Sequence, residues 1–257
     1  MIKCGIEVNK MEIADSGLNE ICCRSFLPEK ETEQVLITLH GFAGDKDSST
    51  IYALAEELTK SGILVFAFDL PSHGADKDTF LLKLSKCFEY VSSVIQYIKD
   101  KYNGKPISFF ATSFGGYLLL NYLRANKIDC KHIILKSPAI FTEDVLQENI
   151  LNEHGYSPCD LKGNIDLGFE RPLLINKSFL EELKENSLKD CSFDKHIDII
   201  QGDMDDVVSV VDNEKYYKEH FRSYNLYYIK NADHRFKNAG DLERVVEIVK
   251  DIFKKDN

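Results

Sequence analysis

The ten residues ISFFATSFGG, Ile107–Gly116, constrain the fold of this chain more than any other stretch. Their first half, Ile107–Ala111, is a short apolar run typical of strands that are buried on both faces of a sheet. The glycines at its end open a helical pattern. A serine on a tight turn from strand to helix needs small residues two positions away on each side, and Ala111 and Gly115 are small. The stretch therefore predicts a strand, a sharp turn at Ser113 and a helix.

The same alternation of apolar runs and helical patterns extends over most of the chain. Six apolar runs predict strands at Val35–Leu39, Ile63–Phe68, Ile107–Ala111, His132–Leu135, Ile197–Ile200 and Leu226–Ile229. Apolar residues spaced by three and four predict helices at Ile51–Lys60, Leu84–Ile98, Tyr117–Arg124, Asn213–Phe221 and Leu242–Phe253. This alternation implies right-handed crossovers, and it predicts an α/β fold with a mostly parallel central sheet covered by helices on both faces.

Two regions depart from this alternation. Near the N-terminus, short segments at Ile6–Ile13 and Ile21–Phe26 are separated by turn-forming residues and predict a hairpin at the sheet edge. The interval from 139 to 194 is longer than one crossover helix needs, and such long excursions are usually lids or binding loops. We therefore predict a core formed by residues 1–138 and 195–257, with residues 139–194 inserted as a small cap.

The composition argues against several classes of protein. Of 257 residues, 44% are hydrophobic and 29% are charged, which is typical of a globular protein. Acidic residues outnumber basic ones by 42 to 32, giving a net charge of −10, whereas a nucleic-acid partner would require a basic face. The apolar runs are shorter than the ~20 residues that cross a bilayer, and the first residues lack a secretory-signal pattern. We expect a cytoplasmic protein without nucleic-acid or membrane partners.

Cysteine and glycine patterns give no indication of a cofactor. The seven cysteines are odd in number and include no C-x-x-C pair, which favours reduced thiols. There is no glycine-rich phosphate loop and no metal-spaced cluster of His and Asp, so we expect neither a cofactor nor a metal. The excess of acidic residues also slightly disfavours anionic substrates.

The segment ATSFGG matches the small–x–Ser–x–Gly pattern of a nucleophile elbow, which holds a serine on an exposed turn. The helix that follows directs its N-terminal dipole and free N–H groups toward the serine oxygen, where negative charge develops during attack. A serine is a weak nucleophile at neutral pH and needs a base, and that base needs an orienting acid. Ser113 is therefore the candidate nucleophile.

Candidates for the acid and the base follow two later strands in the required order. GDMDDVV follows the strand Ile197–Ile200, and NADHRF follows the strand Leu226–Ile229. Both lie just past the carboxyl end of a strand, where open α/β sheets bind their ligands. Ser113, an acid near residue 205 and His234 thus reproduce the order Ser, Asp, His. Asp203 and Asp206 compete with Asp205 as the acid.

With these residues, the chain resembles α/β-hydrolase-fold serine hydrolases from about residue 20 to residue 253, in particular small capped esterases of the cinnamoyl and feruloyl esterase kind. In that family the second Asp of G-D-x-D-x-V-V is the catalytic acid, which implies Asp205. The resemblance also implies an oxyanion hole formed by the backbone N–H groups of Phe42 and Phe114. It assigns structural roles to His40 and His73.

Aromatic residues are the candidates for substrate contacts. Within the predicted cap these are Phe141, Tyr156 and Phe169, which together with Phe42 and Phe114 could form the wall of an apolar acyl or alcohol pocket. Packing of the cap onto the core is the alternative interpretation for each cap aromatic.

The sequence thus predicts a serine hydrolase that cleaves small-molecule carboxylic esters with small to medium acyl groups, aromatic ones among them, through an acyl-enzyme. Three alternatives stay open. A peptidase of the prolyl-oligopeptidase or aminopeptidase kind has a similar elbow, SFGGY. A thioesterase or acyltransferase would use the same triad. A non-catalytic binding protein on this scaffold is disfavoured by the intact Ser, Asp and His. The oligomeric state does not follow from the sequence.

Overall fold

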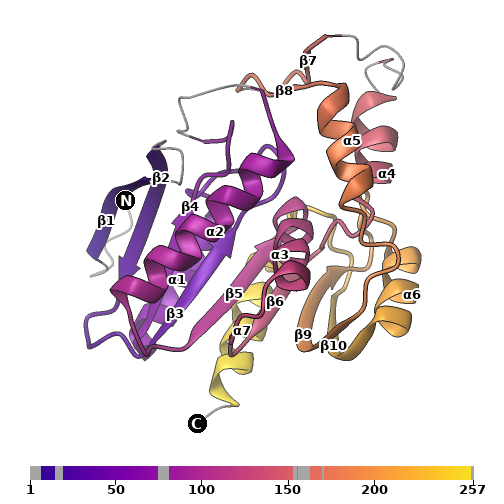
Figure 1. Cartoon of the computed structure of the whole chain (residues 1–257). Coiled ribbons are helices and arrows are strands. Elements are labelled where there is room, and N and C mark those ends of the chain that lie inside the picture. The colour runs from indigo at the N-terminus through magenta and orange to yellow at the C-terminus, as the bar shows by residue number, and fades with distance from the viewer. Residues whose placement is uncertain are drawn as a thin grey trace.

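The computed structural model describes residues 7–14, 20–74, 81–152, 155, 163–169 and 171–255, and an eight-stranded sheet forms its centre (Figure 1). In order across the sheet, the strands are β1 (Glu7–Ala14), β2 (Glu20–Leu27), β4 (Ile63–Phe68), β3 (Gln34–Leu39), β5 (Ile107–Thr112), β6 (Ile133–Lys136), β9 (Phe193–Gly202) and β10 (Phe221–Ile229). The strands from β4 to β10 in this order are parallel. Strand β2 is antiparallel to both of its neighbours. The α/β class and the mostly parallel sheet are therefore confirmed.

Helices cover both faces of this sheet. They are α1 (Ser49–Leu58) with the short 3-10 turn η1 (Thr59–Ser61), α2 (Leu84–Lys101), α3 (Phe114–Ala125), α6 (Val210–His220) and α7 (Asp241–Lys254). Helices α2, α3 and α6 share one hydrophobic cluster with the sheet, and α1 and α7 share a second cluster on the opposite face. In β3, Val35 and Ile37 belong to the first cluster and Leu36 to the second. This alternation explains why the strand sequences are apolar throughout.

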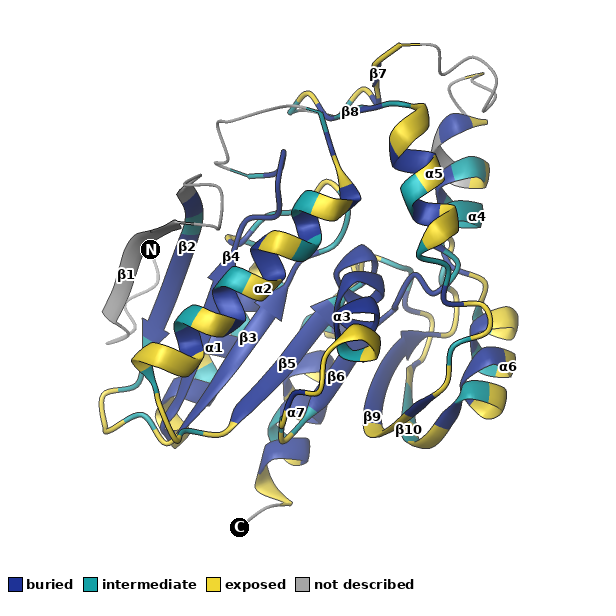
Figure 2. Ribbon diagram, in the orientation of Figure 1, coloured by how far each residue is buried: buried dark blue, intermediate teal, exposed yellow. Residues whose placement is uncertain are grey.

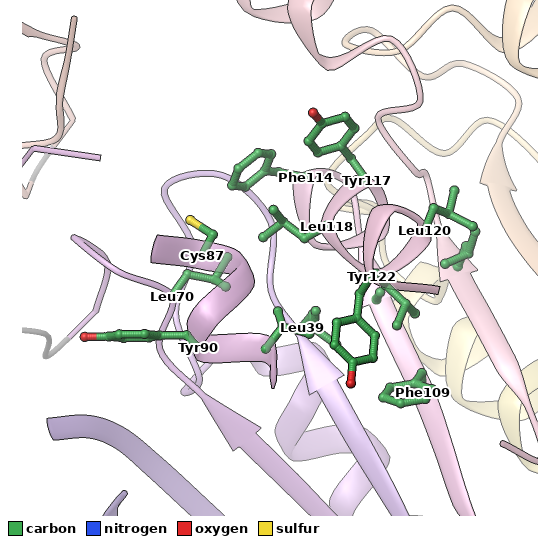
Figure 3. Close-up of a cluster of buried hydrophobic side chains, with 14 of the residues drawn as sticks. Leu39, Leu70, Cys87, Tyr90, Phe109, Phe114, Tyr117, Leu118, Leu120 and Tyr122 are labelled. Atoms are coloured by element: carbon green, nitrogen blue, oxygen red, sulfur yellow. The ribbon is translucent and has the colours of Figure 1, made fainter. Parts of the chain in front are cut away.

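The central strands are buried along almost their whole length, as Figure 2 shows. Around α2 and α3 the core contains large side chains, among them Tyr90, Phe109 and Tyr122 (Figure 3). Burying such aromatic side chains contributes about 1.5–3 kcal/mol each relative to leaving them exposed. The elbow that follows β5 is therefore anchored between a rigid strand and a rigid helix.

The edges of the sheet differ from its centre. The predicted N-terminal hairpin is formed by β1 and β2, which pair along their whole lengths, while its predicted turn lies outside the described residues. At the other edge, the expectation that Leu226–Ile229 is buried on both faces is wrong. Among the described strands, β10 pairs with β9 alone, and Tyr228 is 44% exposed. Strands β9 and β10 also begin earlier than predicted, at Phe193 and Phe221.

The interval 139–194 contains α4 (Thr142–Leu146), the π-helical turn η2 (Gln147–Leu151), the short strands β7 (Ile165–Asp166) and β8 (Leu174–Ile175), and α5 (Lys177–Glu185). These elements lie beyond the carboxyl ends of the parallel strands (Figure 1).

This interval is attached to the core at the start of α2. The carboxylate of Glu182 in α5 accepts hydrogen bonds from the backbone N–H groups of Leu84 and Ser85, at 2.8 and 3.3 Å. The N–H of Leu82 donates to the carbonyl oxygen of Leu174 at 2.8 Å. A helix N-terminus has unpaired N–H groups and attracts negative charge, so Glu182 stabilises α2 while it holds α5 in place.

Three expectations from composition can be compared with the described residues. None of the helices in these residues has the length and apolar character needed to cross a bilayer. The five described cysteines, Cys22, Cys23, Cys87, Cys130 and Cys191, are not in disulfide bonds. No group of three or more His, Cys, Asp and Glu side chains in this part of the chain could hold a metal ion.

Candidate active site

Ser113 occupies the turn between β5 and α3. Its backbone has φ 50° and ψ −116°, a conformation that side-chain-bearing residues rarely adopt and that concentrates at functional sites. Its N–H donates to the carbonyl oxygen of Lys136 at 2.9 Å, which fixes the turn against β6. A Cβ on Gly115 would lie 2.5 Å from the carbonyl oxygen of His40, so only glycine fits there. The motif requires a small residue at position 115 because the backbone of a neighbouring loop lies directly against it.

The structure brings Ser113, His234 and Asp205 into one hydrogen-bonded chain. The Nε2 atom of His234 lies 3.0 Å from Oγ of Ser113. On the other side of the ring, Nδ1 lies 2.9 and 3.0 Å from the two carboxylate oxygens of Asp205. These three residues come from loops that follow β5, β9 and β10, at the carboxyl ends of parallel strands. A carboxylate can only accept, so Nδ1 carries the proton and Nε2 is free to accept from the serine hydroxyl.

The carboxylate of Asp205 is fully buried and held by several donors. It accepts from Nε2 of Gln201 at 2.8 Å and from the backbone N–H groups of Val207 and Val208 at 3.0 and 2.9 Å. Burial alone would raise the pKa of Asp205. The hydrogen bond and charge of His234, with the backbone donor of Val208, outweigh burial and hold the pKa below its ordinary value. Asp205 is therefore ionised at neutral pH.

The two competing aspartates contact the backbone of the His234 loop. The carboxylate of Asp203 accepts from the N–H of Asn231 at 2.5 Å, and that of Asp206 accepts from the backbone N–H of His234 at 3.2 Å. Only Asp205 contacts the imidazole ring among these three acids.

His40 and His73 are buried beside the site and neutral. Nδ1 of His40 donates to the carbonyl oxygen of Gly41 at 2.8 Å, and its Nε2 accepts from the N–H of Leu70 at 3.0 Å, which connects two loops. Burial lowers the pKa of His40 to about 4 and that of His73 to about 3. Nδ1 of His73 donates to the carbonyl oxygen of Pro71 at 2.7 Å, so both imidazoles form hydrogen bonds with the backbone of loops.

A cavity of about 790 Å³ opens at Ser113 and His234. Three of the five predicted aromatic residues line it: Phe42, Phe114 and Phe169. The ring of Phe42 packs edge-to-face on Phe114 and Phe169, with centroids 5.4 and 6.0 Å apart. These rings make one wall of the cavity apolar.

The predicted cap contact Phe141 is not among the described residues that line this cavity. The ring of Phe141 packs edge-to-face on Tyr216 of α6, with centroids 5.8 Å apart, which is the packing alternative considered for each cap aromatic. Phe141 is the residue directly before α4. Tyr156 lies outside the described residues.

The predicted oxyanion-hole donors belong to the two segments that adjoin Ser113, the start of α3 and the loop after β3. Phe114 is the first residue of α3, so its N–H precedes the hydrogen bonds inside the helix. The backbone N–H of Phe42 has no acceptor among the described residues. The loop carrying Phe42 approaches the serine closely, since a Cβ on Gly41 would lie 3.3 Å from Cβ of Ser113.

Two residues at this site were missed by the sequence reasoning. Gln201 follows the predicted strand Ile197–Ile200 directly and donates to Asp205. Lys136 is 4% exposed, lines the cavity, and lies at the end of β6, directly before Ser137. The signal in both cases was a polar residue at the end of an apolar strand, at the edge where the site was expected.

Comparisons with known proteins agree with this architecture. A family model described as "Serine aminopeptidase, S33" matches residues 30–153. The structure is similar to Est1E from Butyrivibrio proteoclasticus, with a TM-score of 0.80 and 21% identity over 96% of this chain and 98% of that one. The ferulic acid-bound form of Est1E gives a TM-score of 0.80 and 22% identity over 95% and 98% of the two chains. The mouse alpha/beta hydrolase domain-containing protein 10 gives 0.77 and 18% over 97% and 100%.

Proposed function

This chain has the α/β-hydrolase fold and resembles serine hydrolases of the esterase kind, and we propose that it hydrolyses carboxylic esters through an acyl-enzyme on Ser113. The observation that carries this proposal is the continuous chain of hydrogen bonds from Ser113 through His234 to an ionised Asp205. Serine activated by a base that an acid orients is the arrangement that acyl transfer requires.

In the first half of the proposed reaction, Ser113 Oγ attacks the ester carbonyl carbon as its proton passes to Nε2 of His234. Asp205 keeps the proton on Nδ1 and stabilises the imidazolium that forms. The carbonyl oxygen becomes an oxyanion, to which the N–H groups of Phe42 and Phe114 donate. Removing one such donor in other hydrolases costs about 3–4 kcal/mol of transition-state stabilisation. The imidazolium then protonates the alkoxide as the bond to the leaving group breaks.

In the second half, water replaces the alcohol. His234 takes a proton from this water as its oxygen attacks the acyl carbon, and a second oxyanion forms at the same donors. The imidazolium returns the proton to Oγ of Ser113 as the ester bond to the enzyme breaks. The products are the carboxylic acid and the free enzyme, so each turnover consumes one water molecule.

We also propose that residues 139–194 act as a cap over this site. Among the cavity-lining residues from this interval, Phe169 and Leu173 follow β7, while Thr142, Val145 and Leu146 belong to α4. Their side chains are mostly apolar, so they suit the hydrocarbon part of an acyl group or an alcohol. The wall formed by Phe42, Phe114 and Phe169 suits an aromatic acyl group.

The test is kcat/KM across a matched panel, with Ser113→Ala as the control. The panel contains p-nitrophenyl acetate, butyrate and octanoate, methyl ferulate, an acyl-CoA thioester and an aminoacyl-p-nitroanilide. We expect an ester to dominate and the Ser113→Ala variant to lose all of that activity. Turnover of the thioester or the anilide alone would contradict the ester assignment, but it would be consistent with catalysis by Ser113, His234 and Asp205. Equal rates for the variant and the parent chain would contradict the role of Ser113.

An aminopeptidase activity is the second candidate, because the family model that matches residues 30–153 has that description. An aminopeptidase must hold the ammonium group of its substrate, which requires a carboxylate in the cavity. Among the described lining residues, Asp45 alone carries a carboxylate, against the cationic side chains of Lys136, Arg171 and Arg235. This charge distribution favours the esterase proposal, and the anilide in the panel distinguishes the two.

A further inference from the structure

Lys136 is a buried cation that the proposed hydrolysis does not use. It lies on β6 in register with Thr112 and is 4% exposed. Its Nζ atom lies 3.9 Å from the ring centroid of Phe236 and 3.5 Å from the carbonyl oxygen of His234. Among the described residues it forms no ion pair with a carboxylate. Buried charges are normally paired, because removing an ammonium from water without a partner is costly.

The nearby acids are already committed to other partners. Asp205 binds the ring of His234, Asp233 pairs with Lys237 at 3.6 Å, and Asp241 accepts from the N–H of Asn238 at 3.1 Å. Their charges favour the protonated form of Lys136, but burial outweighs them and lowers its pKa to about 8. The ammonium is therefore present at neutral pH, and it lacks a direct counter-charge.

The cavity around Lys136 is cationic although the chain is acidic. The described lining residues include Lys136, Arg171 and Arg235 but only one acid, Asp45, whereas the whole chain has a net charge of −10. The lining also includes Ser49 and Thr50, the first residues of α1, and the first turn of that helix contains no acidic residue. The positive end of the helix dipole thus adds to the charge of the side chains.

Lys136 and the nucleophile both contact His234. The backbone oxygen of His234 faces Nζ of Lys136, while the ring nitrogen Nε2 of the same residue faces Oγ of Ser113. Both Lys136 and Ser113 line the one cavity. A ligand that places its ester carbonyl at Ser113 can therefore extend a second group toward the ammonium.

We propose that the ammonium of Lys136 binds a carboxylate on the acyl part of the substrate, so that the preferred substrates are half-esters of dicarboxylic acids. This inference rests on the proposed ester hydrolysis and specifies its substrate class. A single carboxylate neutralises the single buried ammonium. A phosphate dianion would leave one negative charge uncompensated beside Phe236, so the carboxylate is the better match. Arg235 and Arg171 line the cavity and favour the entry of an anion.

The test compares kcat/KM for p-nitrophenyl half-esters of succinate, glutarate and adipate with the corresponding methyl p-nitrophenyl diesters. The two members of each pair have the same acyl chain, and the carboxylate of the half-ester is an uncharged methyl ester in the diester. Charged hydrogen bonds of this kind change binding by about tenfold or more. We expect the charged member to be preferred at one chain length by at least about tenfold. The length with the strongest preference then reports the distance between Ser113 and Lys136.

Variants assign that preference to Lys136. In Lys136→Met the ratio of charged to uncharged kcat/KM falls by about tenfold, and Lys136→Arg retains a preference for the charged ester. Lys189→Met is the matched control, because Lys189 is an exposed lysine paired with Asp144 outside the cavity. It removes the same charge and leaves the ratio as in the parent chain. A parent chain without preference at any length, or a Lys136→Met variant that keeps the preference, overturns the inference.

A binding measurement separates this inference from the proposed hydrolysis. Free succinate, glutarate and adipate are added to the protein, and the shift in Tm is recorded for the parent chain and for Lys136→Met. We expect one dicarboxylate to raise Tm of the parent chain only, even if no ester in the panel is hydrolysed. Neutral diamides of the same acids are the controls. The absence of a shift with any dicarboxylate overturns the inference, whereas failure of hydrolysis with a retained shift affects the proposed function alone.

Discussion

Replacing Lys136 by Met should stabilise the folded chain, although it removes a polar contact. Burial lowers the pKa of Lys136 from 10.5 to about 8. Each tenfold change in this proton affinity corresponds to 1.36 kcal/mol, so keeping the folded lysine protonated at pH 7 costs about 3 kcal/mol. Methionine is similar in length and has no charge to bury. We expect Lys136→Met to be more stable than the parent chain by about 3 kcal/mol at pH 7.

The sign of the pH dependence follows from the same shift. Between pH 8 and pH 10.5 the unfolded lysine keeps a proton that the folded one has released, so the cost of burial disappears as pH rises through this window. The advantage of Lys136→Met is therefore full below pH 8 and is lost toward pH 10.5. Urea unfolding followed by circular dichroism at pH 7, 9 and 10, in carboxylate-free buffers, measures it. Lys189→Met is the control, and other titrating groups cancel in the comparison.

Two results would refute this reasoning. A Lys136→Met variant less stable than the parent chain at pH 7 would mean that the contacts of Lys136 with His234 and Phe236 outweigh the burial of its charge. A stability difference that stays constant from pH 7 to pH 10 would mean that Lys136 keeps its ordinary pKa in the folded chain.

Three further predictions concern the triad and its support. Asp205→Asn should lower kcat for the best ester about 10³–10⁴-fold, because an amide no longer fixes the proton on Nδ1 of His234. Asp206→Asn should lower kcat far less, and equal losses would refute the assignment of Asp205 as the acid. Because burial lowers the pKa of His40 to about 4, stability is lost as pH falls below 6.5, by about 2 kcal/mol between pH 7 and pH 5. In urea unfolding, the His40→Asn variant should not show this part of the loss of stability. The same acid dependence in the variant and the parent chain would contradict the role of His40. Gly115→Ala should destabilise the chain by about 1–3 kcal/mol, because the added methyl group meets backbone oxygens. Gly163 faces open space, so the stability of Gly163→Ala should lie within about 0.5 kcal/mol of the parent chain. Similar urea midpoints for the two variants would contradict this.

Local patterns were sufficient to predict the α/β fold and to identify the three residues of the hydrogen-bonded chain. The apolar run Ile107–Ala111 and the glycines after Ser113 specify a strand, a turn and a helix within ten residues. Parallel strands place the loops after them at one edge, so the order Ser113, Asp205, His234 in the sequence becomes proximity in space. These inferences depend on short-range sequence and on one rule of topology.

Features that depend on distant neighbours were not predicted. Tyr228 is exposed because β10 is at the edge of the sheet, and the strand's own sequence does not reveal its position. Phe141 packs on Tyr216, a contact between α6 and a residue some 75 positions earlier in the chain. The net charge of the chain pointed away from anionic substrates, whereas the charge of the cavity depends on Lys136, Arg171 and Arg235, which are far apart in the sequence.

Trapping the acyl group on Ser113 tests directly whether this serine is the nucleophile. The protein is mixed with a p-nitrophenyl ester that it hydrolyses, quenched in acid within the first turnover and digested, and the peptide containing Ser113 is examined by mass spectrometry. We predict a mass increase equal to the acyl group on Ser113, together with a burst of one p-nitrophenol per active site and no adduct in Ser113→Ala. An unmodified Ser113 peptide, with hydrolysis continuing at the same rate in Ser113→Ala, would contradict it.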